Sequence, residues 1–293
     1  MDRIVRFLNA NETVRFYAVQ STQAAVDAAN THGLSPTACA AMGRSISACA
    51  IMMADQKAAK NITLQFKGDG PLQGICVVGR PGVLIKAYCG NPQADVPPKW
   101  AGKLNVGALV GQGRLSVIKD LNMREPWVGQ VEMRSGEIAE DIAQYYFTSE
   151  QKPSAVALGV LVGTEGIPVA SGGILAQPLP GCPEEDLVQL EILSRDLGDI
   201  SHKLFDSGDI EQVLQDTYGP MQLKRLDELP LQFCCDCSRE RVEGALIAMG
   251  RKELGSLMEQ EETTEVTCHF CNAAYRFTRE DLMRLLQSAT GGV

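Results

Sequence analysis

The sequence lacks any run of eighteen consecutive apolar residues, although 45% of its 293 residues are hydrophobic. Residues 1–6 mix charged and apolar side chains and contain no uninterrupted hydrophobic core of a secretory signal. A membrane-spanning helix needs about 20 apolar residues in sequence. We therefore expect neither secretion nor membrane insertion, and we expect a cytoplasmic protein.

Motifs for binding phosphate groups are also lacking. No GxxxxGK[ST] loop occurs anywhere in the chain. The glycine-rich segment at 68–71 (GDGP) joins two predicted strands and precedes no helix, so it predicts a hairpin turn. Basic residues are in deficit, because the net charge is −9 and residues 181–230 carry 4 basic and 12 acidic side chains. Such a surface repels nucleic-acid backbones, so we predict no nucleic-acid partner.

Cysteine, in contrast, is abundant, with 10 residues. In a reducing cytoplasm, free thiols, metal ligands and redox sensors are more common than permanent disulfides. Five cysteines are scattered singly among small or apolar neighbours and are predicted to be buried hydrophobes: Cys39, Cys49, Cys76, Cys89 and Cys182. The other five lie in two short segments, 234–237 and 268–271.

The spacing of these five cysteines predicts a tetrahedral zinc site. Two closely spaced pairs separated by about thirty residues are typical of structural zinc ligands. The second pair is Cys268 and Cys271. The first pair has two interpretations, because Cys234 with Cys237 makes a CxxC motif and Cys235 with Cys237 makes a CxC motif. Spacing alone leaves both open, and a closed shell of four thiolates has no position for substrate.

Residues 1–180 are predicted to form an α+β (α/β) core domain with a central sheet and crossing helices. Helices are predicted over 22–31, before Gly33, and from an N-cap at Ser35 to about residue 59. Apolar and polar residues alternate in the segments predicted as strands. These segments are 4–8, 14–19, 62–66, 75–78, 83–88, 115–118, 155–162 and 169–175.

Residues 181–231 are predicted to be an amphipathic, acidic, helical linker. Apolar residues recur at spacings of three and four, which places them on one face of a helix. This stripe consists of Leu187, Leu190, Leu193, Leu197, Ile200 and Leu204. A second helix is predicted over 209–218. The linker cannot bury the stripe by itself, so the stripe must dock on the core, on the cysteine-rich module or on a partner.

Residues 232–293 are predicted to be a small zinc-binding redox-switch domain. Ser238 is a candidate N-cap of a helix that stops at Gly250, and residues 278–281 resemble a capping box. About sixty residues with few large apolar side chains fold poorly without a cross-link. We expect zinc to supply that cross-link.

Four motifs resemble those of the redox-regulated chaperones of the 33 kDa heat-shock protein family. The C-terminal motifs are CDCSRER at 235–241 and CHFCN at 268–272. The N-terminal motifs are GDGPL at 68–72 and YFTSEQ at 146–151. The resemblance therefore extends over essentially the whole chain.

The resemblance implies a function and a ligand set. Family members are ATP-independent holdases and not enzymes; they are inactive while reduced and zinc-bound, and active, often as homodimers, when oxidised. They bind unfolding proteins and prevent aggregation during oxidative stress. In this chain the implied ligands of one zinc ion are Cys235, Cys237, Cys268 and Cys271, and Cys234 is an extra thiol.

Oxidation is expected to pair neighbouring thiols, Cys235 with Cys237 and Cys268 with Cys271. These bonds leave the two segments unconnected, so we expect zinc release and unfolding of the module. The linker stripe would then be freed, which makes its six residues candidate client-binding residues.

Two other function classes are less consistent with the sequence. A zinc-ribbon nucleic-acid-binding protein is disfavoured by the acidic charge. A thiol-disulfide oxidoreductase is disfavoured because no CxxC motif opens a helix after a strand in a thioredoxin-like unit.

Overall fold

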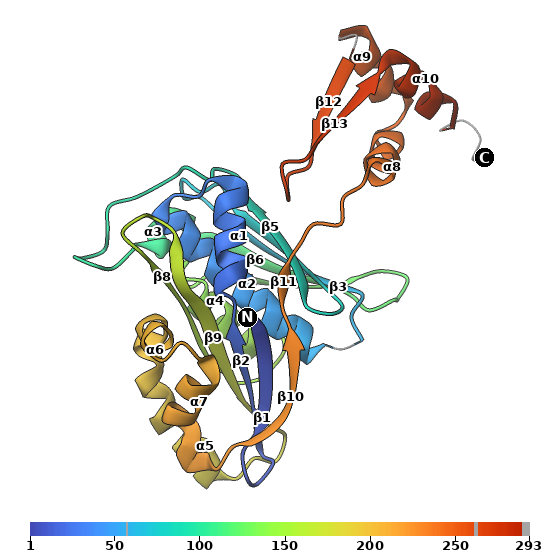
Figure 1. Ribbon diagram of the computed structural model, residues 1–293. Helices are drawn as coiled ribbons and strands as arrows, with labels where there is room; N and C mark the ends of the chain where they lie inside the picture. Colours follow the sequence, from blue (N-terminus) through green and yellow to red (C-terminus); the bar gives the residue numbers. More distant parts are fainter. Residues whose placement is uncertain (57, 261–262, 289–293) are drawn as a thin grey trace. The chain divides into compact units, whose positions relative to one another are not determined.

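The computed structural model describes residues 1–56, 58–260 and 263–288 (Figure 1). Contacts divide the chain into two compact units, Met1–Cys234 and Cys235–Val293, which are described separately. Residues 181–231, predicted as a linker, lie within the first unit.

The described strands of the first unit form two sheets, accompanied by helices, so the predicted mixed class is confirmed, although the strands do not form one central sheet. The five-stranded sheet has the order β10 (Lys224–Pro230), β1 (Arg3–Leu8), β2 (Val14–Gln20), β9 (Pro168–Pro178), β8 (Ala155–Val162), all antiparallel. The six-stranded sheet has the order β11 (Gln232–Phe233), β5 (Leu84–Cys89), β4 (Ile75–Arg80), β3 (Asn61–Gly68), β6 (Gly113–Asp120), β7 (Trp127–Glu132). In this second sheet only the β11–β5 pair is parallel among the described strands.

Helix α2 (Pro36–Asp55) packs against strands of both sheets and is buried over residues 37–54. It begins as predicted, because the Ser35 hydroxyl accepts a hydrogen bond from the Ala38 N–H at 3.2 Å. Its end at Asp55 falls short of the predicted end near residue 59. In length and composition α2 could cross a membrane, but its apolar stretch is entirely buried inside the protein, as in a core helix. Helix α1 (Thr22–His32) ends at left-handed Gly33, as predicted.

The GDGP segment is the predicted turn between antiparallel β3 and β4. The Asp69 carboxylate accepts the backbone N–H of Gln112 at 2.7 Å, which ties the turn to the start of β6. A Cβ at Gly70 would lie 2.3 Å from the carbonyl oxygen of Leu109, so only glycine fits there. The turn is hydrogen-bonded to the end of helix α3 (Val106–Val110), because Gly70 N donates to Val110 O at 3.1 Å. Helix α4 (Ala139–Thr148) packs on β7 and β8.

The linker stripe is docked on the outer face of the five-stranded sheet. Four stripe residues are buried there with exposed fractions of 3–5%: Leu190, Leu197, Ile200 and Leu204. Leu187 and Leu193 are half-buried. The linker is not one continuous helix. It comprises α5 (Glu184–Ser194), the 3-10 turn η1 (Arg195–Asp199), α6 (Ile200–Ser207), α7 (Ile210–Tyr218), η2 (Gly219–Met221) and strand β10.

The second unit comprises α8 (Arg239–Met249), α9 (Arg251–Gln260), β12 (Thr263–Thr267), β13 (Ala274–Thr278) and α10 (Arg279–Ser288). The predicted capping box is confirmed, since Thr278 Oγ1 accepts from Asp281 N at 3.2 Å and Asp281 Oδ2 accepts from Thr278 N at 3.0 Å. Among its described residues the core cluster has five buried apolar side chains: Leu246, Leu254, Phe277, Leu282 and Leu285. This core is too small to provide much stability by itself.

Candidate metal centre

Four cysteine sulfurs converge in the second unit. Cys235 and Cys237 precede α8, and Cys268 and Cys271 lie in the turn between β12 and β13. The four Sγ atoms lie within 4.8 Å of one another. Across the two segments, the Sγ atoms of Cys235 and Cys268 are 3.8 Å apart, and those of Cys237 and Cys271 are 3.2 Å apart.

The second cysteine pair is shaped by a tight turn. The Cys268 carbonyl accepts the N–H groups of Cys271 at 3.3 Å and Asn272 at 2.8 Å, and the Cys268 N–H donates to Ala273 at 2.9 Å. Asn272 has a φ of 59°, a left-handed conformation that asparagine tolerates better than most residues. This geometry explains the CxxCN motif, because the turn aims both thiols to one side.

Arg239 of the SRER motif joins α8 to the rest of the second unit. Its guanidinium lies 4.4 Å from the ring centre of Phe277 and forms ion pairs with Asp281 at 3.0 Å and Glu243 at 3.2 Å. It also donates to the carbonyl of Arg276 at 2.9 Å. The arginine therefore fixes the helix that follows the first cysteine pair against β13 and α10.

The neighbouring motif residues hold the first cysteine pair at the start of α8. The Ser238 hydroxyl accepts the N–H of Arg241 at 3.4 Å, so the predicted N-cap is confirmed. The Arg241 guanidinium pairs with the Asp236 carboxylate between the two cysteines.

The donor set fits a structural zinc ion. Tetrahedral coordination at about 2.3 Å places sulfur ligands about 3.8 Å from each other, close to the Cys235–Cys268 distance. The cluster can therefore hold a metal ion. Four thiolates would close the coordination shell, which is the arrangement of a structural site and not of a catalytic one.

Tyr275 on β13 adds a hydrogen bond to this cluster. Its hydroxyl donates to Cys237 Sγ at 3.1 Å, and this bond lowers the pKa of Cys237 to about 7. Burial raises the pKa of Cys271 to about 12 and also raises the pKa of Cys235. Without metal, Cys237 is thus partly ionised near neutral pH while Cys271 is protonated. The sequence analysis did not identify Tyr275, and its spacing of four residues from Cys271 was the available signal.

We expect the Tyr275→Phe substitution to weaken zinc binding by about tenfold, because hydrogen bonds to ligands orient them and stabilise the thiolate. Competition with a chromogenic chelator measures the affinity. Tyr88→Phe is the matched control, because it removes a tyrosine hydroxyl that bonds to Cys76 in the first unit. Equal zinc affinity of Tyr275→Phe and wild type would contradict a role for this hydroxyl.

Cys234 does not belong to the four-sulfur cluster and is held by the first unit. Its N–H donates to the carbonyl of Ile85 at 2.8 Å, which continues the pairing of β11 with β5. Arg80 Nη2 lies 3.4 Å from the Cys234 carbonyl oxygen and 3.7 Å from its sulfur. The structure therefore gathers the CxC pair and not the CxxC pair that spacing also allowed.

The scattered cysteines lie elsewhere in the first unit. Cys39, Cys49 and Cys89 are buried, as predicted, whereas Cys76 and Cys182 are half-buried. Burial raises the pKa of Cys39 to about 11 and that of Cys89 to about 12. These thiols are protonated at neutral pH and thus poor nucleophiles.

The family model described as "Hsp33 protein" matches residues 2–278 of this chain. The chain belongs to the Hsp33 family. The 33 kDa chaperonin of Caldanaerobacter subterraneus subsp. tengcongensis is 42% identical, over 98% of this chain and 99% of its own length. That of Clostridium perfringens strain SM101 is 41% identical, over 98% of this chain and 92% of its own.

A solved Hsp33 structure agrees with this assignment. The crystal structure of the 33 kDa chaperonin from Thermotoga maritima has a TM-score of 0.87 and 31% identity, and the match covers 98% of each chain. The family resemblance that the motifs predicted is thus confirmed. As a member of the Hsp33 family, the chain is a chaperone and not an enzyme.

Proposed function

We propose that this Hsp33 chain is a cytoplasmic, ATP-independent holdase that is switched on by oxidation of its cysteine cluster. In the reduced state, Cys235, Cys237, Cys268 and Cys271 would hold one zinc ion and the chaperone would be inactive. The convergence of four thiols from two segments, in a unit whose described core has five buried apolar side chains, carries this proposal.

When bound, zinc would keep the four sulfurs as thiolates and cross-link residues 235–237 to residues 268–271. Structural zinc contributes on the order of 10–16 kcal/mol of apparent binding free energy, far more than so small a core provides. The fold of the second unit would therefore depend on its cysteines remaining reduced.

Oxidation would join Cys235 to Cys237 and Cys268 to Cys271. As each S–S bond forms, two electrons pass to one peroxide, and the two thiol protons leave with its oxygen atoms as water. No ligand thiolate would remain, and neither bond would connect the two segments. A bond between Cys237 and Cys271, whose sulfurs are 3.2 Å apart, would keep them connected, so disulfide mapping separates the two outcomes.

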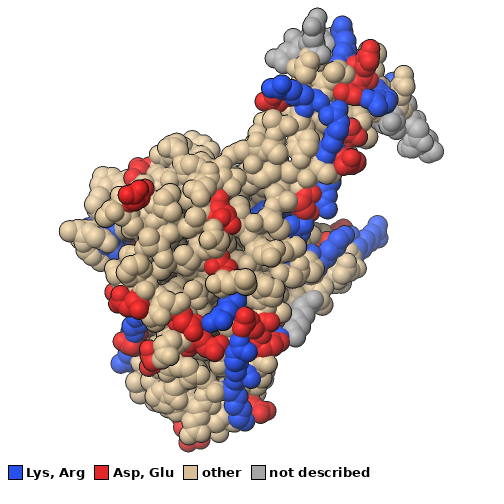
Figure 2. All heavy atoms as spheres, in the orientation of Figure 1, with Lys and Arg blue, Asp and Glu red and all other residues tan. Residues whose placement is uncertain are grey.

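The route from the second unit to the linker runs through residues 224–234. Strand β10 pairs with β1, and its side chains form ion pairs over this part of the surface, where acidic and basic groups lie side by side (Figure 2). Arg6 pairs with Asp227, and Arg225 pairs with Glu211 of α7 at 3.1 Å. The Arg225–Glu211 pair lies in solvent, and ion pairs of that kind contribute little stability.

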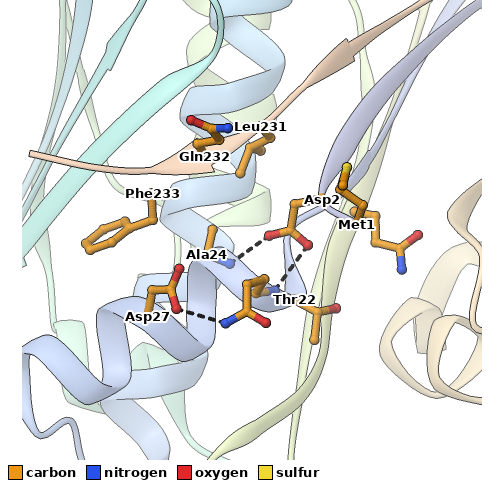
Figure 3. A pocket seen from close by; sticks show the side chains of 10 residues that line it. Met1, Asp2, Thr22, Ala24, Asp27, Leu231, Gln232 and Phe233 are labelled. Atoms are coloured by element: carbon orange, nitrogen blue, oxygen red, sulfur yellow. Dashed lines mark hydrogen bonds between the residues drawn. The ribbon is translucent and has the colours of Figure 1, made fainter.

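Strand β11 is the weakest point of this route. It has two residues and lies at the edge of its sheet, where it pairs with β5. Beside this pairing, Leu231 N donates to Asp2 O at 3.1 Å, Gln232 N to Val83 O at 3.2 Å and Cys234 N to Ile85 O at 2.8 Å. A cavity of about 580 Å³ lies beside it, lined by Asp2, Asp27 and Phe233 among others (Figure 3). Unfolding that starts at Cys235 would readily detach β11 and then β10, and so loosen the linker.

The freed linker would bind clients. Its six-residue stripe (Leu187, Leu190, Leu193, Leu197, Ile200 and Leu204) includes four residues that are buried against the five-stranded sheet in this structure. Loss of that packing would expose a contiguous apolar face, which unfolding proteins can bind. We also propose that the oxidised form is a homodimer, and that neither nucleic acid nor membrane is a partner.

Leu204→Ala should give the reduced protein partial holdase activity. Truncating a buried leucine costs about 2–5 kcal/mol, which would shift the linker toward its undocked state while five stripe residues remain. Light scattering of an aggregating client measures the gain. Phe205→Ala is the matched control, because Phe205 lies on the same helix with 54% of its surface exposed. Equal behaviour of the two variants would argue against linker docking as the inhibitory contact.

The direct test of the function is suppression of aggregation by the wild-type protein. A chemically unfolded client is diluted into reduced, zinc-loaded protein or into protein treated with peroxide at mildly elevated temperature. We expect suppression only by the oxidised protein, and reversal after thiol reductant plus zinc. Full suppression of aggregation by the reduced protein would mean that the cysteine cluster has only a structural role.

A further inference from the structure

A second cavity in the first unit lies where the linker meets the core. It has a volume of about 430 Å³ and lies beside η1, the 3-10 turn that interrupts the linker helices. Part of its wall is apolar, formed by Val156 and Leu158 of β8 and by Leu197 of the linker. The remaining wall is strongly charged.

Positive charge predominates among the six charged side chains that line this cavity, which are Arg44, Lys99, Lys103, Arg195, Glu137 and Glu140. Glu137 is shared by two cations, because it lies 2.7 Å from Arg44 Nη1 and 3.4 Å from Lys99 Nζ. Within the described residues, Lys103 and Arg195 form no ion pair. Four cations therefore face two carboxylates, in a chain whose net charge is −9.

The hydrogen bonding of Arg44 is incomplete. This side chain extends from α2, and the residue is only 8% exposed. Its Nη1 donates to the carboxylate and to the backbone carbonyl of Glu137, but its buried Nε has no acceptor among the described residues. Buried donors without acceptors are rare in native structures. The site has more donors than acceptors and more positive than negative charge.

Glu137 does not relieve this imbalance. Burial would raise the pKa of Glu137, but the hydrogen bond and charge of Arg44, together with Lys99, lower that pKa overall. Glu137 is therefore already ionised at neutral pH, and its one carboxylate serves two cations.

We propose that this cavity binds a small phosphate-bearing anion, held between Arg44, Lys99 and Lys103 of the core and Arg195 of the linker. Guanidinium and ammonium groups are the side chains that proteins use for phosphate. A cavity of 430 Å³ lies within the usual range for small-molecule sites, and the apolar wall can accommodate the organic part of a phosphate ester. The cavity beside β11 has no such character, because the Asp2 carboxylate there already accepts the N–H groups of Gln23 and Ala24 (Figure 3).

A bound anion would join the linker to the core. Arg195 belongs to η1, whereas the other three cations belong to residues 1–180. The complete site exists only while the linker is docked, so an anion that binds it stabilises the docked linker. This inference does not depend on the proposed redox switch.

Titration calorimetry of the reduced, full-length protein tests the site with diphosphate and inorganic phosphate, with sodium chloride at matched ionic strength as the reference. We expect diphosphate to bind more tightly than phosphate. Lys103→Gln and Arg195→Gln should each weaken diphosphate binding by about tenfold, and Lys103→Arg should retain it. Lys203→Gln is the matched control, because Lys203 is a linker cation outside the cavity that pairs with Asp196. Circular dichroism checks that each variant is folded.

Hydrogen exchange provides a readout of the linker itself. Diphosphate should slow the exchange of residues 195–207 in the wild type but not in Arg195→Gln. Diphosphate binding that is absent, or that both glutamine variants retain, overturns the site. Binding with unchanged exchange of residues 195–207 overturns the link between the site and the docked linker.

Discussion

Cys235→Ser should lower the zinc content of the reduced protein from about one ion per chain to well below one, whereas Cys234→Ser should leave it unchanged. The two substitutions make the same chemical change at adjacent positions, so each is the control for the other. Cys235 Sγ lies 3.8 Å from Cys268 Sγ within the cluster, whereas Cys234 is held by Ile85 and Arg80 of the first unit.

The expected effect is large because a closed four-thiolate site depends on every ligand. Serine offers a much poorer donor than thiolate, and the site as a whole contributes on the order of 10–16 kcal/mol. Zinc per chain is measured by elemental analysis of protein purified under reducing conditions. The reverse outcome, with zinc lost in Cys234→Ser and kept in Cys235→Ser, would show that the ligands form a CxxC pair.

Chelation of the metal from the reduced protein should unfold residues 235–288 and leave the sheets of the first unit folded. The described residues of the second unit include five buried apolar side chains, which are too few to keep it folded without metal. In the first unit, α2 and the two sheets enclose an extensive core. Hydrogen exchange followed by mass spectrometry reports both units in one experiment.

Backbone amides of α8, β13 and α10 should exchange at rates near those of an unfolded chain, while those of β3 and β6 should stay protected. Zinc added back under reducing conditions should restore the slow exchange. Slow exchange of Leu246 and Phe277 in protein shown to be free of metal would mean that the small core is sufficient without zinc.

Local sequence patterns predicted the strands that alternate in burial, but not the strands whose pairing is set by tertiary contacts. Residues 224–230 include four charged side chains and are mostly exposed, yet they form β10 because β1 offers a free edge and Arg6 an ion partner for Asp227. Strand β7 was also not predicted; it lies at the edge of the six-stranded sheet and most of its residues are exposed. The division into two sheets was also beyond prediction, because periodicity identifies strands but not their partners.

The linker shows the same limit. Its stripe was predictable from spacing, and four of its six residues are buried. The spacing of an amphipathic face does not show which surface covers it. The structure was needed to show that the stripe docks on the five-stranded sheet. The interruption at η1 was likewise missed, although Gly198 lies within it.

At the metal centre, spacing predicted two cysteine pairs but left the first pair ambiguous. The fold separates the alternatives, because the hydrogen bond from Cys234 N to Ile85 O belongs to the β-pairing of the first unit. Tyr275 escaped prediction because alternation gives a strand tyrosine no specific role until its neighbour is known.

The central claim is that loss of zinc, unfolding from about residue 235 and gain of holdase activity are one coupled event. About 30 mV of redox potential corresponds to about 1.4 kcal/mol for a two-electron couple, so two disulfides formed by a strong oxidant can offset the zinc site. The most direct measurement follows all three quantities in one peroxide time course at mildly elevated temperature. Released zinc is followed with a colorimetric chelator, unfolding by circular dichroism and activity by light scattering of an aggregating client. We predict a common half-time and joint reversal by thiol reductant plus zinc; complete zinc release and unfolding without any gain of activity would contradict the account.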